Sequence, residues 1–266
     1  MSNIIAVAGK GGTGKTTIAS IIIRVLKEAE SGPTLAIDAD PNSNLGEMLG
    51  IKDISTIVEI IDDISRNPGQ IPAGMTKDRF IGLKVQESLN EEDGFDLLSM
   101  GRPEGPGCYC FINNMLRELM TKLMKSYSNI VIDNEAGMEH LSRRVVRSID
   151  ELFIVSDASV IGIRSAGRIS RLQDELKIKV KNRYLVLNKS RGSVSLLKDE
   201  IKETGLDLKA VLPLDKALED NAVKNKSVFD LKKNNPALDP IRELLTHLAA
   251  PMPRPLKWGQ KASFKR

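Results

Sequence analysis

A glycine-rich stretch near the N-terminus, Gly-Lys-Gly-Gly-Thr-Gly-Lys-Thr-Thr at residues 9–17, contains the residue types needed to hold a chain of phosphates. An apolar run at residues 4–8 precedes it, and a long helical pattern at residues 16–29 follows it. This motif between a strand and a helix is typical of a phosphate-binding loop. The glycines let backbone N–H groups close around phosphate oxygens, and the helix N-terminus adds partial positive charge. The stretch therefore predicts a nucleoside triphosphate site.

Two side chains of this loop have defined roles in phosphate chemistry. We expect Lys15 to reach the β- and γ-phosphates and the Thr16 hydroxyl to complete the shell of a Mg²⁺ ion. The remaining loop contacts to the nucleotide are expected from Gly11, Gly12, Thr13, Gly14 and Thr17. Lys10 is different, because a second lysine at the start of the loop is not needed to hold phosphate.

Acidic residues follow two of the apolar runs that we expect to be strands. Asp38 ends the run at residues 34–38, with Asp40 two residues later, and Asp133 ends the run at residues 129–133. Ligands bind at the carboxyl ends of strands in open α/β sheets, so these carboxylates are expected beside the phosphate loop. An apolar strand ending in aspartate also suits a Mg²⁺-sensing element, which makes Asp133 the candidate. The alternative is that Asp38 and Asp40 only cap the next helix.

Three more residues have side chains or backbone properties that bear on this site. Gly137 gives the backbone after Asp133 the freedom to swing toward or away from a γ-phosphate, as switch loops do. Asn188 closes another apolar run, and its carboxamide can both donate to and accept from the edge of adenine. A strand-end cap is the alternative for Asn188. His140 is interpreted as a hydrogen-bonded structural histidine in preference to a metal ligand.

The two cysteines of the chain, Cys108 and Cys110, lie one residue apart in a segment rich in glycine and proline at residues 101–111. A disulfide between them would be strained, inert thiols do not suit an open loop, and redox pairs are more often Cys-x-x-Cys. A soft-metal site is the fourth and favoured interpretation. Ni²⁺ or Zn²⁺ usually takes four ligands, and two copies related by a two-fold axis would supply four thiolates. The pair therefore predicts a metal site shared by a homodimer.

The elements that must position these residues are visible as apolar runs and helical patterns. Strands are expected at residues 4–8, 34–38, 95–100, 129–133, 151–156, 183–189 and 208–215. Helices are expected at residues 16–29, 54–67, 111–123, 162–172, 194–204 and 238–248. Continuously apolar strands indicate a parallel sheet buried on both faces. The sequence therefore predicts one α/β domain over residues 1–250, a doubly wound and mostly parallel sheet of about seven strands flanked by helices. Residues 68–93 give no clear pattern.

The composition limits the classes of function. The 266 residues are 41% hydrophobic with a net charge of +4, which is ordinary for a globular protein and does not demand a nucleic-acid partner. No run approaches the roughly 20 apolar residues of a membrane span, and no signal peptide is visible, so we expect a cytoplasmic protein without membrane insertion. Residues 251–266 form a proline-rich basic tail with the one tryptophan, Trp258. A disordered end is the first interpretation of this tail, and a docking strip for a partner is the alternative.

The phosphate loop with Lys10 and the Asp-Ala-Asp-Pro segment at residues 38–41 resemble the deviant phosphate loop and first switch of the MinD/ParA/nitrogenase-iron-protein class of ATPases. This resemblance implies that Lys10 crosses a dimer interface to the partner's nucleotide. It also implies that Asp40 positions the attacking water and that Asp38 supports the Mg²⁺ shell. Together with Lys15, Lys10 and Asp40 are then the catalytic residues of a P-loop NTPase.

In the same class, an asparagine–lysine pair and the final strand and turn contact the base. The resemblance therefore implies base contacts at Asn188 and Pro213.

The Gly-Cys-Tyr-Cys segment and the Asn-Glu-Ala-Gly-Met-Glu-His segment at residues 134–140 narrow the resemblance to the CooC-type ATPases, over roughly residues 3–215. These are nickel-insertion factors for carbon monoxide dehydrogenase, with relatives that act on acetyl-CoA synthase. The resemblance implies a homodimer with ATP and metal at its interface, and Mg²⁺-dependent ATP hydrolysis coupled to nickel delivery. Zn²⁺ is a second metal for such thiolates.

Two other functions share this fold class. A ParA- or MinD-like positioning ATPase is the first, although MinD-type members need a C-terminal amphipathic membrane helix, which the three prolines of the tail argue against. An electron-donating iron protein is the second, but its two cysteines per chain lie far apart in sequence.

Overall fold

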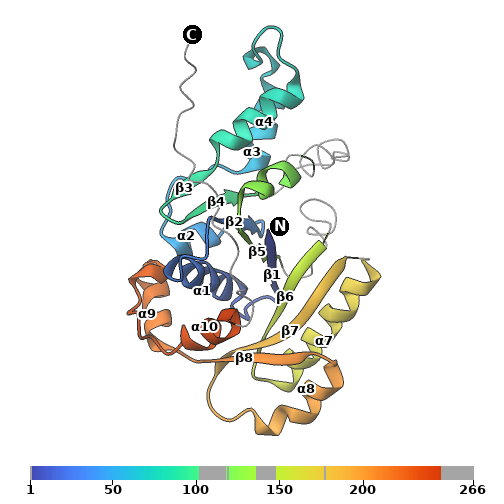
Figure 1. The fold of residues 1–266 in the computed structure, drawn as a ribbon, viewed down its shortest axis with the longest axis vertical. Coiled ribbons are helices and arrows are strands. Elements are labelled where there is room, and N and C mark those ends of the chain that lie inside the picture. The colour runs from blue at the N-terminus through green and yellow to red at the C-terminus, as the bar shows by residue number, and fades with distance from the viewer. Residues whose placement is uncertain (1, 102–117, 119, 136–147, 177, 247–266) are drawn as a thin grey trace.

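The computed structural model describes residues 2–101, 118, 120–135, 148–176 and 178–246. Within them, eight strands form one sheet in the order β3-β4-β2-β5-β1-β6-β7-β8 (Figure 1). All neighbouring strands are parallel except β3 and β4. The strands are β1 (Asn3–Gly9), β2 (Thr34–Ala39), β3 (Asn90–Glu92), β4 (Phe95–Ser99), β5 (Asn129–Asn134), β6 (Ser148–Asp157), β7 (Lys179–Ser190) and β8 (Asp207–Pro213).

Helices cover both faces of this sheet. They are α1 (Lys15–Glu28), α2 (Leu45–Leu49), α3 (Ile57–Arg66), α4 (Lys77–Glu87), α7 (Val160–Glu175), α8 (Lys198–Thr204), α9 (Lys216–Val223) and α10 (Asp239–Thr246). One apolar core joins the sheet to α3, α4 and α7, and a second joins it to α1, α2 and α10. Side chains of a strand alternate between faces, so β1 sends Ala6 and Ala8 into the first core and Ile5 and Val7 into the second.

The predicted α/β architecture is confirmed, and the structure adds elements that the sequence did not indicate. The eighth strand is the short, antiparallel edge strand β3, which lies in the segment that gave no pattern. The same segment contains α4, whose buried stripe is only Phe80, Ile81 and Val85 among charged neighbours. Thr76 caps this helix by accepting a hydrogen bond from the Arg79 N–H. A stripe this short between charges has little helical periodicity to detect.

The topology brings the candidate residues to one edge of the sheet. The central strand β1 lies between β5 and β6, and its carboxyl end leads into the phosphate loop. Asp38 on β2 and Asp133 on β5 are register partners at the neighbouring strand ends, and Asn188 lies near the carboxyl end of β7. Parallel strands therefore place residues from four segments around one site.

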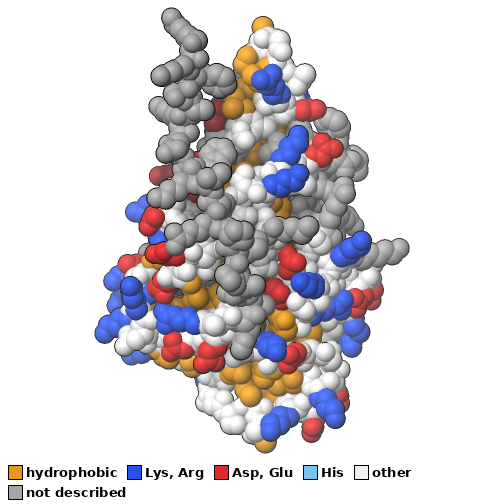
Figure 2. Space-filling model, in the orientation of Figure 1, with side chains coloured by type: hydrophobic (Ala, Val, Ile, Leu, Met, Phe, Trp, Pro, Cys, Tyr) orange, Lys and Arg blue, Asp and Glu red, His pale blue; other side chains and the backbone are white. Residues whose placement is uncertain are grey.

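The surface and the helices add two observations. On the face seen in Figure 2, lysine and arginine side chains are interspersed with aspartate and glutamate. The described part of this face therefore has no single basic stripe of the kind that nucleic-acid binding uses. Of the helices in the described ranges, none has the length and apolar character needed to cross a bilayer.

Candidate functional site

The phosphate loop leads directly into α1, and its last glycine shapes the entry. Gly14 is the N-cap residue of α1 with φ 90°, and no side chain caps the helix. The Gly14 carbonyl accepts the first helical hydrogen bond, from the Ile18 N–H at 3.0 Å. The N–H groups of the first turn therefore stay available for an anion, as a phosphate site requires.

The two lysines of the loop lie in different environments. Lys15 is only 8% exposed at the start of α1, whereas Lys10 is exposed at the opposite end of the loop. The Thr13 hydroxyl donates to the Lys10 carbonyl at 2.8 Å and so fixes the loop internally. A lysine buried beside helix N–H groups suits the role predicted for Lys15, contact with the β- and γ-phosphates.

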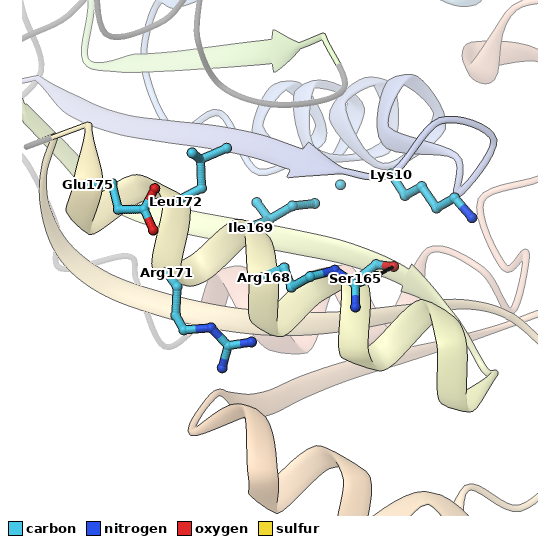
Figure 3. Close-up of a pocket in the computed structure, with 8 residues that line it drawn as sticks. Lys10, Ser165, Arg168, Ile169, Arg171, Leu172 and Glu175 are labelled. Atoms are coloured by element: carbon cyan, nitrogen blue, oxygen red, sulfur yellow. Dashed lines mark hydrogen bonds between the residues drawn. The ribbon is translucent and has the colours of Figure 1, made fainter.

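A cavity of about 600 Å³ lies between the start of the loop and α7 (Figure 3). Ile169 and Leu172 of α7 point toward β1, while Arg171 points away from it. Lys10 also points away from α7, out of the cavity. The side chains of Lys10 and Arg171 therefore do not converge on one anion site in the cavity, and Lys10 extends away from α7.

Strand β7 contacts the loop from the other side. The Asn188 Nδ2 donates to the Thr13 carbonyl at 2.9 Å, and the Lys189 Nζ donates to the Gly12 carbonyl at 3.1 Å. The Asn188 Oδ1 accepts from the Lys189 backbone N–H at 2.9 Å. A carboxamide has two donors and two lone pairs, so Asn188 keeps one of each for a ligand. That remaining pair matches the N6 donor and N7 acceptor of adenine.

Pro213 lies at the end of β8 beside this part of β7. It is the register partner of Ser190, and the Leu214 N–H donates to the Ser190 carbonyl at 2.9 Å. The two residues expected to contact the base, Asn188 and Pro213, are thus on neighbouring strand ends.

Asp38 is completely buried at the end of β2. Its carboxyl oxygens accept from the Leu45 N–H at 2.8 Å and from the Asp40 N–H at 3.2 Å. Burial raises the pKa of Asp38 to about 6, although these two hydrogen bonds oppose the shift. Asp40 in turn accepts from the Asn42 N–H at 3.0 Å. Asp38 does contact the first residue of α2, so the capping interpretation describes part of its role.

Asp133 is the least satisfied polar side chain of the site. It is 1% exposed, and within the described residues neither carboxyl oxygen has a hydrogen-bond partner. Burial raises the pKa of Asp133 to about 7; the nearby Thr16 hydroxyl and Lys15 ammonium lower it, and the charges of Asp38 and Asp40 raise it further. An unpaired buried carboxyl is costly, and pairing with a cation would remove that cost.

These side chains fit a bound Mg²⁺. Hard oxygen donors are what Mg²⁺ prefers, and here they are the Asp133 and Asp38 carboxylates and the Thr16 hydroxyl next to the phosphate loop. The structural reason to expect a cation here is that, among the described residues, the Asp133 oxygens have no hydrogen-bond partner, and a cation would pair with them.

The segment after β2 is joined to the end of β4. Ser43 has φ 50°, in the left-handed region that few non-glycine residues adopt, and its Oγ accepts from the Ser99 Oγ at 2.9 Å. The Met100 N–H donates to the Asp38 carbonyl at 2.8 Å, and the Val58 N–H donates to the Met100 carbonyl at 3.2 Å. Strand β4 is the one that precedes the cysteine segment in sequence.

Several predicted residues lie outside the described residues: Gly137, His140, Cys108, Cys110 and Trp258. The metal site, the switch hinge and the tail therefore stay predictions, as does the division at residue 250. In the ranges that are described, no three histidine, cysteine, aspartate or glutamate side chains come together as a metal site.

Two contacts of the site are not predicted by the sequence. The Lys189 hydrogen bond to the Gly12 carbonyl joins residues 177 positions apart. The Asn134 Nδ2 donates to the Val7 carbonyl at 2.9 Å, which connects β5 to β1 at the site.

A phosphate loop after the central strand of a mostly parallel sheet, with carboxylates at neighbouring strand ends, defines the class of P-loop nucleotide-binding proteins. Comparison with known proteins places the chain within that class. The chain belongs to the CobQ/CobB/MinD/ParA nucleotide-binding family, whose model matches residues 4–228.

Individual relatives agree with this family. An uncharacterized ATP-binding protein of Methanocaldococcus jannaschii is 41% identical over 91% of this chain and 96% of its own length. The carbon monoxide dehydrogenase accessory protein CooC of Rhodospirillum rubrum is 29% identical over 85% of this chain and 89% of its own length. The crystal structure of a ParA family ATPase from Chlorobium tepidum matches with a TM-score of 0.71, covering 93% of this chain and 99% of that one at 21% identity. This structural match shows the fold alone.

Proposed function

We propose that this chain is an ATP-hydrolysing metallochaperone that forms a homodimer and delivers nickel to the cluster of a carbon monoxide dehydrogenase or acetyl-CoA synthase. The observation that carries the proposal is the Cys-x-Cys pair, Cys108 and Cys110, in the segment that follows β4. The end of β4 is hydrogen-bonded to the Asp38 segment of the nucleotide site. The similarity to an accessory protein of carbon monoxide dehydrogenase supports the choice of client.

The nucleotide chemistry follows from the residues around the loop. Free N–H groups at the start of α1 and the Lys15 ammonium bind the phosphates of ATP. Asp40 orients a water molecule for in-line attack on the γ-phosphorus, which breaks its bond to the bridging oxygen and yields ADP and phosphate. The exposed Lys10 reaches the nucleotide of the partner subunit and stabilises the charge that develops there.

Mg²⁺, when bound, supplies neutralising charge at the phosphate oxygens, and Asp133, Asp38 and the Thr16 hydroxyl would hold it. The protein's own side chains suit this position, since Asp133 is buried, has no hydrogen-bond partner among the described residues, and lies close to Thr16 and Lys15.

Nickel is the cargo in this proposal, and four thiolates hold it across the dimer. ATP favours the closed dimer because each bound nucleotide contacts both subunits, through the loop of one and Lys10 of the other. Closure brings the two Cys108–Cys110 pairs together. Hydrolysis removes the γ-phosphate contacts near Asp40 and Gly137, the interface loosens and the metal is released to the client.

Metal content and molecular mass, measured with and without a non-hydrolysable ATP analogue, test this function. We expect the analogue to favour a dimer that holds about one Ni²⁺ or Zn²⁺ in a four-thiolate site. Replacing both cysteines, Cys108→Ala with Cys110→Ala, should abolish metal binding and leave ATP binding intact. Lys15→Ala is the matched control, since it should remove ATP-driven dimerisation and leave the thiols in place.

Two results would overturn the proposal. Retention of about one metal per dimer in the double cysteine variant would place the metal site elsewhere. An ATP-driven dimer that binds no metal would favour the alternative of a ParA- or MinD-like positioning ATPase, and an iron–sulfur chromophore in the purified protein would favour an electron-donating iron protein.

A further inference from the structure

Two carbonyl groups of the phosphate loop are held by side chains of a single strand. The Gly12 carbonyl accepts from the Lys189 Nζ at 3.1 Å, and the Thr13 carbonyl accepts from the buried Asn188 Nδ2 at 2.9 Å. Both donors are on β7, more than 170 residues away in sequence. The loop is thus fixed at two successive peptide groups.

The geometry of the peptide bond gives these two contacts a consequence for phosphate binding. In a trans peptide the C=O and the following N–H point in opposite directions. Holding the carbonyls of residues 12 and 13 toward β7 therefore turns the N–H groups of Thr13 and Gly14 away from β7. The Thr13 N–H donates to the Lys10 carbonyl at 3.4 Å, so the Gly14 N–H is the one of the two that the loop can direct at an anion.

The backbone of Lys189 is adapted to this contact. Its φ is 55°, in the left-handed region, and its N–H donates to the Oδ1 of the preceding Asn188. Lysine rarely adopts this conformation, whereas glycine does so freely. The strained turn is what sends the two neighbouring side chains to the same loop, because adjacent residues of a regular strand point to opposite faces.

We propose that Lys189 is a positioning residue of the nucleotide site: its ammonium group holds the Gly12 carbonyl, and with Asn188, which holds the Thr13 carbonyl, it fixes the loop backbone in the conformation that binds phosphate. This inference rests on the proposed binding of ATP, and it assigns to Lys189 a role separate from contact with the base. The role does not require Lys189 to touch the nucleotide.

Four variants test it: Lys189→Gly, Lys189→Met, Lys189→Arg and, as a surface control, Lys198→Met. Glycine removes the ammonium and also relieves the strained φ, so a loss of affinity in Lys189→Gly would not come from added backbone strain. We expect Lys189→Gly and Lys189→Met to bind both ATP and ADP about tenfold more weakly, the loss of roughly one charged hydrogen bond. The kcat of the saturated enzyme should change less than KM, and Lys189→Arg should retain most of the affinity.

Hydrogen exchange on the nucleotide-free protein supplies a second readout. The Thr13 amide, which is hydrogen-bonded to the Lys10 carbonyl, should exchange faster in Lys189→Gly, while the amides in the middle of α1 stay as protected as in the wild type. Binding of ATP by Lys189→Gly within twofold of the wild type would overturn the inference. Failure of the wild-type chain to bind ATP would instead overturn the proposed function, so the two failures are distinguishable.

Discussion

Around the carboxyl end of β1, the phosphate-loop side and the carboxylate side of the site differ in how their polar groups are satisfied. On the loop side, the carbonyls of Gly12 and Thr13 are paired with donors from β7, and the Thr13 hydroxyl is bonded within the loop. On the carboxylate side, Asp133 is buried with no hydrogen-bond partner in the described part of the chain. The backbone of the loop side is therefore held by hydrogen bonds, whereas the carboxyl oxygens of Asp133 have none in the described part of the chain.

The difference follows from what each side must bind. An anion site needs N–H donors in a fixed frame, and the frame is built by pairing the carbonyls of the same peptides with other residues. A cation site needs oxygen atoms with free lone pairs, and both Asp133 oxygens keep theirs within the described part of the chain. Leaving a carboxyl unpaired in the interior is costly, so Asp133 holds a proton more tightly than usual, with its pKa raised to about 7. The loop side is therefore preformed, while the carboxylate side is completed by its ligand.

The largest effect is expected from breaking the loop side with Gly14→Ala. Gly14 has φ 90°, and an added Cβ would overlap the Nδ2 of Asn188. The backbone strain and the overlap together should lower the free energy of unfolding by about 4 kcal/mol. Displacing Asn188 should also release the Thr13 carbonyl and weaken ATP binding more than 100-fold, measured by calorimetric titration against the wild type.

Gly12→Ala is the matched control for this prediction. Gly12 also has positive φ, 81°, but an added Cβ has no heavy atom within 4 Å. Gly12→Ala should lower the free energy of unfolding only by the cost of backbone strain, about 1–2 kcal/mol. Equal losses for the two variants would mean that the contact with Asn188 does not set the geometry of the loop.

A smaller effect is expected from pH, and it belongs to the carboxylate side. The folded-state pKa of Asp133, about 7, lies above the ordinary value near 3.9 for an unfolded aspartate, so folding favours the protonated form. Its contribution to stability is therefore fully present below about pH 4 and is lost as the pH rises through 7. We expect the nucleotide-free protein to lose on the order of 2–3 kcal/mol in unfolding free energy between pH 5 and 8 through this group.

Asp133→Asn isolates that contribution, because asparagine has nearly the same shape and does not ionise. The variant should be more stable than the wild type at pH 8 and equal to it below about pH 4, as measured by urea unfolding without Mg²⁺. The charged neighbours Lys15, Asp38 and Asp40 remain in both proteins. Parallel stability curves for the two proteins would show that Asp133 is already ionised in the folded state.

The sequence predicts the two sides of the site to different extents. The loop, its flanking strand and helix, and the aspartates at strand ends are visible because each is encoded in a short contiguous stretch with a distinctive period. The parallel order of the sheet then places Asp38 beside Asp133 in register, as expected for strand ends of this fold.

What the sequence does not reveal are contacts between distant segments. The bond from Asn188 to Thr13 spans 175 residues, and the bond from Ser99 to Ser43 spans 56. No local pattern encodes either one, since both depend on which strand ends become neighbours. The sequence does not predict strand β3 because it is only three residues long, and it does not predict helix α4 because that helix buries only a short apolar stripe. Tertiary packing decides such elements more than their own propensity does.

The smallest effect is expected at the link between the carboxylate side and β4. Ser99→Ala removes the hydroxyl that donates to Ser43 and should lower the free energy of unfolding by about 1 kcal/mol. Ser43→Gly loses the same bond but relieves the left-handed φ of 50°, so it should be close to neutral.

The functional readout of this link is the ratio of metal affinities with a non-hydrolysable ATP analogue and with ADP. If the bond transmits the state of the Asp38 segment to β4 and the cysteine segment beyond it, both variants should reduce that ratio although their stabilities differ. The two variants separate stability from coupling. Ser43→Gly recovers the free energy of unfolding by relieving the left-handed φ, but it still lacks the hydroxyl that would transmit the coupling. An unchanged ratio in both variants would assign the coupling to the backbone bond between Met100 and Asp38, which neither substitution removes.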